Sequence, residues 1–195
     1  PDAGVYYWNA TFTVPEGARL YLEGVFPHSR YMSLISYDGR GAPIESLADY
    51  LIVPDENSIN PFVEGANRTI KKRAYKVEIV NLSPQIRREE GTRLELQTDV
   101  EGTGLQKEIR HRNSLNATQY GQRQQSIIYR IYVPDKGKNE SGGVPLPEPV
   151  LILKNKEELI GDKACEILHT NQPPQISIDA VGLPMTVYSK LVNQP

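Results

Sequence analysis

Residues 6–14 alternate between apolar and polar side chains, and this period of two is the feature that most constrains the fold. Such a rhythm places every second residue on the same face, as a β-strand with one buried side requires. The face predicted to be buried carries Tyr6, Trp8, Ala10, Phe12 and Val14. The opposite face carries Tyr7, Asn9, Thr11 and Thr13.

Further strand-like runs follow, and most of them are bounded by turn-forming residues. Pro15 and Gly17 form one turn signal, and Asp38 with Gly39 forms another, because Pro fixes φ and Gly tolerates the positive φ of tight turns. The two faces of the run 30–37 are less distinct, which is compatible with a central strand covered on both sides. The predicted strands after the first are 19–26, 30–37, 73–80, 92–98, 126–133 and 150–153.

Many short strands with almost no helix predict an all-β fold, an antiparallel β-sandwich of jelly-roll type. One short C-terminal helix is expected over 161–169. We expect a single domain over 1–172, with a long exposed polar excursion at 99–125. Residues 173–195 form an extended tail that is a candidate for an added strand. The segment 41–62 is expected to be an irregular, functional loop with at most one helical turn near 44–48.

Charge and hydropathy exclude two classes of partner. The 22 Lys and Arg residues nearly balance the 24 Asp and Glu residues, so the chain lacks the concentrated basic surface that nucleic acid binding needs. No apolar run reaches the length of a membrane span. The single cysteine, Cys165, excludes an intrachain disulfide, and its candidate roles are a small buried hydrophobe or a thiol activated by His169.

Five Asn-x-Ser/Thr triplets favour a secreted, periplasmic or cell-surface location with attached glycans. Free use of Asn, Ser and Thr on a polar β-protein surface is the alternative explanation. Because the chain begins with Pro1, we also expect any signal peptide to have been removed. The acceptor asparagines of the triplets are Asn9, Asn67, Asn81, Asn116 and Asn139.

A cluster of polar residues around the strand 30–37 and the following loop gives the candidate ligand site. A strand advances about 3.3 Å per residue, so the ends of this run lie on the order of 25 Å apart. The cluster forms one site only if the loop folds back to one end, where Arg30 would pair with Asp49 or Asp55. Such a pair also serves as a loop-pinning contact. The candidate ligand-binding residues are His28, Arg30, Tyr37, Asp38, Asp49 and Asp55.

No complete catalytic or cofactor motif is present, and we predict no cofactor. Residues 55–58 together with Asp49 offer oxygen ligands for Ca²⁺, but without EF-hand spacing. The scattered histidines His28, His111 and His169 do not predict a transition-metal site. There is no Gly-x-Ser-x-Gly motif for serine chemistry.

In combination, several segments resemble a known family of secreted bacterial proteins, the domain of unknown function 1214 family. The resemblance covers about two thirds of the chain. It implies a jelly-roll-like β-sandwich outside the cytoplasm and implies no reaction, and the chain departs from the pattern in 99–125 and after Pro173. The matching residues are Trp8, Pro15, Gly17 and the segments 27–33, 37–39, 47–49, 53–55, 60–62 and 129–135.

Three functions remain open from the sequence. The first is a non-catalytic binding module for a polar organic or carbohydrate ligand or a protein partner. The second is a structural subunit of a surface assembly or fibre, a homo-oligomer that uses the tail 173–195 for strand addition. The third is an enzyme in which Asp49 or Asp55 acts as a base and Arg30 binds an anion, which would require a raised carboxyl pKa.

Overall fold

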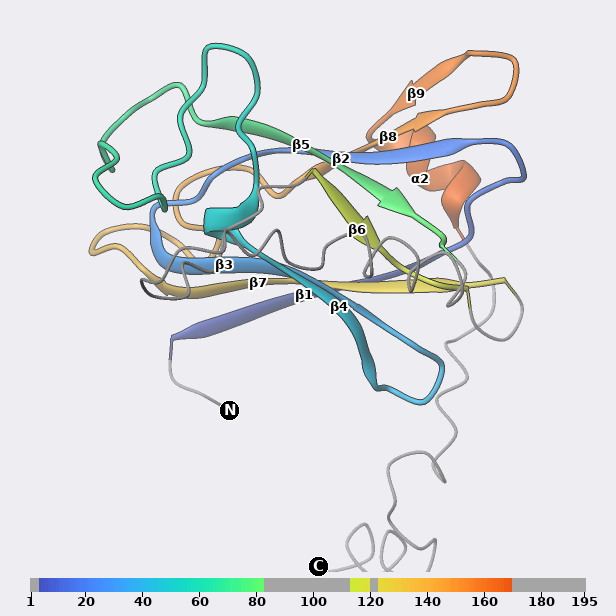
Figure 1. The fold of residues 1–195 in the computed structure, drawn as a ribbon, viewed down its shortest axis with the longest axis horizontal. Coiled ribbons are helices and arrows are strands. Elements are labelled where there is room, and N and C mark those ends of the chain that lie inside the picture. The colour runs from blue at the N-terminus through green and yellow to red at the C-terminus, as the bar shows by residue number, and fades with distance from the viewer. Residues whose placement is uncertain (1–3, 83–112, 120–122, 170–195) are drawn as a thin grey trace, which may run out of the picture.

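The structure is a computed structural model, and it describes residues 4–82, 113–119 and 123–169. Two β-sheets lie one above the other as two layers in Figure 1, with the helix α2 (Asp162–Leu168) beside one end. In spatial order, one sheet contains β1 (Val5–Phe12), β7 (Gln125–Pro134), β3 (Ser29–Tyr37) and β4 (Pro43–Ala48). The other contains β6 (Ser114–Asn116), β5 (Ala74–Val80), β2 (Arg19–Val25), β8 (Glu148–Ile152) and β9 (Glu158–Ile160).

The predicted all-β sandwich with one short C-terminal helix is confirmed. Pairing is antiparallel in both sheets except between β5 and β6, which run parallel. The jelly-roll connection stays a prediction, because β5 and β6 are joined through residues 83–112, which lie outside the described ranges. The predicted strand 92–98 and the tail 173–195 also lie outside them.

The alternating pattern of the first strand gives the expected inner face only in part, because Phe12 is buried while Tyr6 and Ala10 are exposed. In the register of β1 with β7, Trp8 lies opposite Tyr129 and Ala10 lies opposite Ile127. In the other sheet Leu20 and Leu22 are buried opposite Ile79 and Val77. The core therefore lies between the sheets, where removal of apolar surface from water stabilises the fold. Its fully buried members include Phe26, Met32, Leu34, Leu47, Ile52, Tyr75, Val77, Leu115 and Ile131.

The strand β3 is buried on both of its faces, as its sequence predicts. Leu34 faces the core, and its neighbours Ser33 and Ile35, which point to the other face, are buried as well. β3 lies between β7 and β4 and therefore has hydrogen-bonded neighbours on both edges. This explains why no clean polar face is visible in its sequence.

Two segments differ from the sequence-based expectation. Residues 43–48 form the strand β4 rather than an irregular loop, because Leu47 reaches the core and the backbone pairs with β3. A helical turn does form, but later, as the 3-10 helix η1 (Asp49–Leu51). In the excursion 99–125, the described part is not exposed throughout: β6 pairs with β5, and Leu115 and Ala117 are fully buried.

Residues 113–117, which we call the clamp segment, hydrogen-bond to both sheets. Towards β5, Glu78 N donates to Asn113 O at 2.8 Å and Ala117 N donates to Val80 O at 2.8 Å. Towards the other sheet, Ser36 Oγ donates to Asn116 O at 2.6 Å, and Asn116 N donates to the Glu45 carboxylate at 2.5 Å. The clamp segment therefore closes the sandwich along the edge formed by β4 and β6.

The helix α2 packs at the other side of the sandwich. Its buried residues Ala164 and Leu168 belong to the core, and Thr13 N donates to Leu168 O at 3.0 Å. Gly161 precedes the helix with a φ of 59°, a conformation that glycine adopts without strain. In the described ranges, no helix combines the length and the apolar character needed to cross a membrane.

We predict that Gly24→Ala destabilises the sandwich. A Cβ on Gly24 would lie 2.5 Å from Cζ of the fully buried Tyr75 ring, which itself packs against Phe26 at a centroid distance of 4.8 Å. Overpacking of this kind costs about 1–3 kcal/mol, and urea unfolding measures it. In a double-mutant cycle, Tyr75→Leu should lower the free energy of unfolding less in the Gly24→Ala background than in the otherwise unchanged chain. Additive effects of the two substitutions on the free energy of unfolding would show that the Tyr75 ring does not require a glycine at position 24.

Candidate functional site

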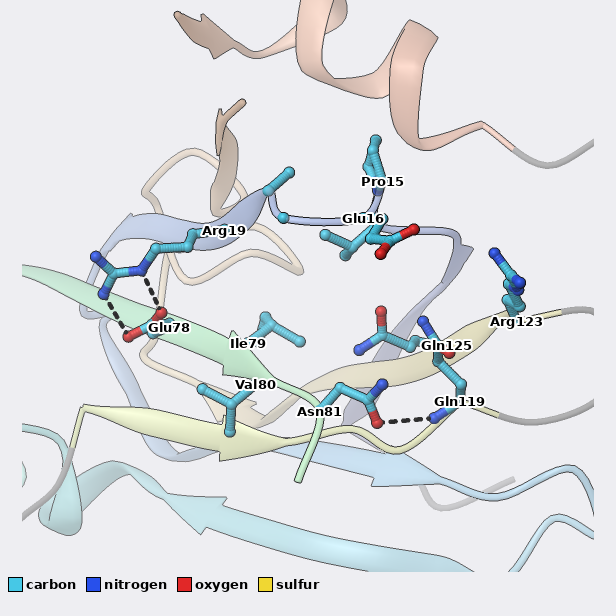
Figure 2. Close-up of a pocket in the computed structure, with 13 residues that line it drawn as sticks. Pro15, Glu16, Arg19, Glu78, Ile79, Val80, Asn81, Gln119, Arg123 and Gln125 are labelled. Atoms are coloured by element: carbon cyan, nitrogen blue, oxygen red, sulfur yellow. Dashed lines mark hydrogen bonds and ion pairs between the residues drawn. The ribbon is translucent and has the colours of Figure 1, made fainter. Parts of the chain in front are cut away.

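A polar pocket of about 620 Å³ lies at the end of the sandwich where the β1–β2 turn, the end of β5 and the start of β7 meet. Figure 2 shows its side chains converging from these separate segments. Its volume falls within the range of small-molecule sites, about 300–1,000 Å³. Its lining consists of residues 14–19 and 78–81 with Gln119, Arg123 and Gln125.

The turn between β1 and β2 forms one wall of the polar pocket. Ala18 N donates to Pro15 O at 3.0 Å, and Gly17 has a φ of +76°. This is the turn that Pro15 and Gly17 predict, since an L side chain at such a φ is strained. The turn presents Glu16 to the pocket, with its carboxylate directed towards Arg123 and Gln125 in Figure 2.

A bidentate ion pair fixes a second wall. Arg19 Nε and one terminal nitrogen of its guanidinium donate to the two carboxylate oxygens of Glu78, at 2.8 and 3.0 Å. The Arg19 guanidinium also lies 5.1 Å from the centroid of the Tyr21 ring. Two parallel hydrogen bonds hold both side chains in one geometry, which a single contact does not. The hydrogen bonds that Arg19 donates to Glu78, reinforced by the charge of that carboxylate, raise the pKa of Arg19.

Three amide side chains lie along the floor. Asn81 Oδ1 accepts a hydrogen bond from Gln119 N at 3.3 Å, as Figure 2 shows. Gln125 Nε2 donates to Ala117 O of the clamp segment at 2.7 Å. Since only the NH₂ group of an amide can donate to a carbonyl, this bond fixes which way the Gln125 amide faces. Its oxygen then points towards the space below the β1–β2 turn.

The Gln125 carbonyl oxygen is the unsatisfied group of this pocket. Gln125 is 1% exposed, and its Oε1 accepts no hydrogen bond from the part of the chain that the structure describes. A buried acceptor without a donor costs about 1–3 kcal/mol. A ligand hydroxyl or N–H that donates to this oxygen removes that cost, so the group favours a hydrogen-bonding ligand.

The remaining polar groups supply both donors and acceptors without a dominant charge. Glu16 and Arg123 are exposed at the rim and carry opposite charges, and the charges of Arg19 and Glu78 balance within their pair. Amides, a guanidinium and a carboxylate together match the hydroxyl groups of a neutral polyhydroxylated molecule better than an anion or a cation. Val14 and Ile79 add small apolar patches for its C–H faces.

The six residues predicted as a site lie elsewhere, and none of them lines the polar pocket. β3 pairs with β7 from Ser29 opposite Pro134 to Tyr37 opposite Ser126, so its two ends lie at opposite ends of the sandwich. This agrees with the expected separation. His28 and Arg30 lie at the start of the strand, and Tyr37 and Asp38 at its end.

Asp49 is a structural residue in this fold. It is 3% exposed, its Oδ2 accepts from Met32 N at 2.8 Å, and its Oδ1 accepts from Tyr50 N at 2.7 Å. The first of these bonds joins Asp49 to β3 directly beyond the β3–β4 ladder. Burial raises the pKa of Asp49 to about 6, although both backbone donors and Arg68 oppose the shift.

His28 is held mainly through its backbone. His28 N donates to Gly142 O, and His28 O accepts from Asp135 N, each at 2.9 Å. Burial lowers the pKa of His28, and the nearby charges of Arg73 and Lys138 lower it further. Arg30 is exposed, and the ion pairs among the described residues are Arg19–Glu78 and Lys76–Glu23. The expected pairing of Arg30 with Asp49 or Asp55 is therefore absent from the described ranges.

The last members of the predicted set also serve the backbone. Asp38 Oδ1 accepts from Arg40 N at 2.9 Å and from Ala42 N at 2.8 Å, which shapes the β3–β4 hairpin. Asp55 N donates to Ala74 O at 2.9 Å, beside the other sheet. Burial raises the pKa of Asp55, and the nearby Glu23 raises it further.

The structure also bears on the predicted metal ligands, the glycan acceptors and Cys165. Within the described residues, no group of three or more His, Cys, Asp or Glu side chains is arranged to hold a metal ion. Asn116 is 4% exposed and its Oδ1 accepts from Leu82 N, so the expected glycan cannot attach there in the folded chain. Asn9, Asn67 and Asn139 are exposed. Cys165 is exposed rather than buried as a small hydrophobe.

Sequence reasoning missed the polar pocket because its walls come from distant parts of the chain. Residues 14–19 and 78–81 have the patterns of a turn and a strand end, and Gln119 and Arg123 fall in the predicted polar excursion. The available signal was Gln125, a polar residue at the start of an apolar, alternating run. Only the fold shows that this position faces inward.

The chain matches no family model, no curated protein and no solved structure. The resemblance to the domain of unknown function 1214 family therefore stays a prediction.

We predict that Asp49→Asn weakens the dependence of stability on pH. The folded pKa of Asp49 is about 6 against an ordinary value of 3.8, so between these values the folded chain binds a proton that the unfolded chain releases. The stability from this group is complete below pH 3.8 and is lost as pH rises through about 6. The loss is on the order of 3 kcal/mol, and urea unfolding from pH 4 to pH 7 measures it.

Because asparagine does not titrate, the variant should lose less free energy of unfolding over this pH range than the unchanged chain. Its absolute stability is expected to fall, because one backbone N–H now faces the amide NH₂ instead of an oxygen. Equal slopes for the two proteins would show that Asp49 does not carry the pH dependence.

Proposed function

We propose that the protein is an extracytoplasmic, non-catalytic binding module whose polar pocket takes a neutral polyhydroxylated ligand, such as a mono- or disaccharide. The observation that carries the proposal is the buried Gln125 carbonyl oxygen, which faces a cavity of about 620 Å³ and lacks a donor among the described residues. A sugar hydroxyl satisfies that oxygen. Further hydrogen-bonding groups come from Arg123 and Glu16 at the rim and from Gln119 on the floor.

The exposed sequons support the extracytoplasmic part of the proposal. Asn67 and Asn139 lie in exposed loops, where an attached glycan meets no steric obstacle from the core. The chain's nearly balanced charge also suits a neutral ligand better than a nucleic acid.

A structural-subunit function is the second proposal, and one observation favours it. Among the described strands, β1 (Val5–Phe12) pairs on one side only, and an edge strand is the usual place for an added strand. The predicted donor, residues 173–195, lies outside the described ranges. Catalysis by Asp49 has weaker support, since both carboxylate oxygens accept hydrogen bonds from the backbone.

Titration of the full chain with glucose, N-acetylglucosamine, maltose and cellobiose tests the first proposal, with saturation-transfer NMR as the readout. We expect saturable binding of at least one of these sugars. Gln125→Leu keeps the side-chain volume and removes the carbonyl, and should weaken that binding at least about tenfold. Its stability should change little, since loss of the bond to Ala117 O is offset by loss of the unsatisfied oxygen.

Arg123→Ala tests the rim and should also weaken binding, whereas Arg40→Ala is the matched control. Arg40 is also exposed, but it lies at the tip of the β3–β4 hairpin and does not line the pocket. Absence of saturable binding by every sugar, or equal effects of the two arginine substitutions, would contradict the proposal.

A further inference from the structure

The inner face of β1 is incompletely covered. Trp8 and Ala10 lie opposite the core residues Tyr129 and Ile127, yet Trp8 is only half-buried and Ala10 is exposed. β1 is the edge strand on the side away from the clamp segment. The sandwich is therefore closed at one edge and open at the other, and the opening leaves apolar surface accessible.

Two adjoining cavities occupy this opening, and together we call them the apolar cleft. Their volumes are about 340 and 120 Å³. The first reaches Phe12 and Leu168, and the second reaches Trp8 and Leu146. Both are lined by Ala10, Leu22, Ile127 and Pro147, so they form one continuous space.

The apolar cleft is long and narrow. From Trp8 to Phe12 it follows β1 over a distance of about 13 Å, at about 3.3 Å per residue. An extended alkyl chain of roughly ten carbons has a similar length, given carbon–carbon bonds of about 1.5 Å. Aliphatic and aromatic walls favour such a chain because burying it removes apolar surface from water.

The helical end of the apolar cleft is acidic. Cys165 and His169 line the cleft, and Asp162 and Glu166 join them around the adjacent hollow. Lys163 of the same helix lines neither space. Burial, followed by the charges of Asp162 and Glu148, raises the pKa of Cys165, so the thiol adds no negative charge at neutral pH. A carboxylate head group is disfavoured beside these residues, and a neutral or cationic one is accepted.

We propose that the apolar cleft is a second binding site, which takes a single unbranched alkyl chain of about ten carbons with a neutral or cationic head group. The head lies beside α2, and the chain end lies against Trp8. This site differs from the polar pocket in its walls and in the ligand it selects, and neither site depends on the other for its proposal.

Trp8 is the only tryptophan of the chain, so its fluorescence reports on the inner end of the apolar cleft. The probe is 10-bromo-1-decanol, whose terminal bromine quenches tryptophan on contact. We expect saturable quenching with the full chain below the solubility limit of the probe. 2-Bromo-1-decanol, with its bromine beside the hydroxyl group, should bind with less quenching. Decyltrimethylammonium should compete for the site at least tenfold better than decanoate.

Ala10→Leu fills the shared part of the apolar cleft and should weaken probe binding at least tenfold. Tyr7→Leu is the control, since Tyr7 is exposed on the opposite face of β1 and lines neither cavity. Circular dichroism should show that both variants keep the fold. Non-saturable quenching, equal losses in both variants or preference for decanoate would each overturn the proposal.

Acrylamide quenching distinguishes the proposed ligand from two other possible occupants of the apolar cleft, the chain's own C-terminal residues and a second copy of the chain. Acrylamide quenching of Trp8 in the unliganded chain should be efficient if the cleft is open. Shielding at all protein concentrations would mean that residues 170–195 of the same chain fill it, and shielding only at high concentration would mean that a second copy does. Either form of shielding would overturn the proposal.

Discussion

Closure of one edge by the clamp segment is the constraint on which the rest of the structure depends. Five residues hydrogen-bond to β5 on one side and to Ser36 and Glu45 on the other, so they hold the two sheets together where no continuous strand does. These contacts join polar groups inside the sandwich, where each unpaired group would cost stability. Apolar packing alone does not fix the offset between two sheets, whereas directional bonds to both of them do.

The position of the clamp segment also determines the character of the two openings. Ala117 O accepts a hydrogen bond from the NH₂ group of Gln125, so the amide oxygen points towards the polar pocket. On the far edge no equivalent segment bridges β1 and β8 in the described ranges, and only α2 covers part of the gap. One edge therefore carries polar contacts between the sheets, and the other leaves apolar residues such as Trp8 incompletely buried.

The fold was predictable wherever a strand is long enough to show its period. β2, β5 and β7 each alternate over seven or more residues, and the structure buries most of their apolar residues. β1 alternates as well, but of its predicted inner residues in the strand only Phe12 is buried. β4, β6 and β9 were not predictable, since their pairing depends on partners that are distant in sequence. The predicted site residues lie apart from the polar pocket for a related reason. Asp38 and Asp49 have the chemistry of ligand-binding residues, but the fold uses their oxygens to hold the backbone.

Gln125 is the position where the residue present differs most clearly from the one that strand alternation predicts. Gln125 and Ile127 point to the same inner face of β7, and a strand of pure alternation would make both of them apolar. Ile127 lines the apolar cleft, whereas Gln125 lines the polar pocket and pairs across the strands with Phe12, which belongs to the cleft. One cross-strand pair thus separates the polar pocket from the apolar cleft, because Gln125 lines the first and Phe12 lines the second. A glutamine at a core position costs stability when its buried amide oxygen lacks a donor, and a ligand group that donates to this oxygen would offset that cost.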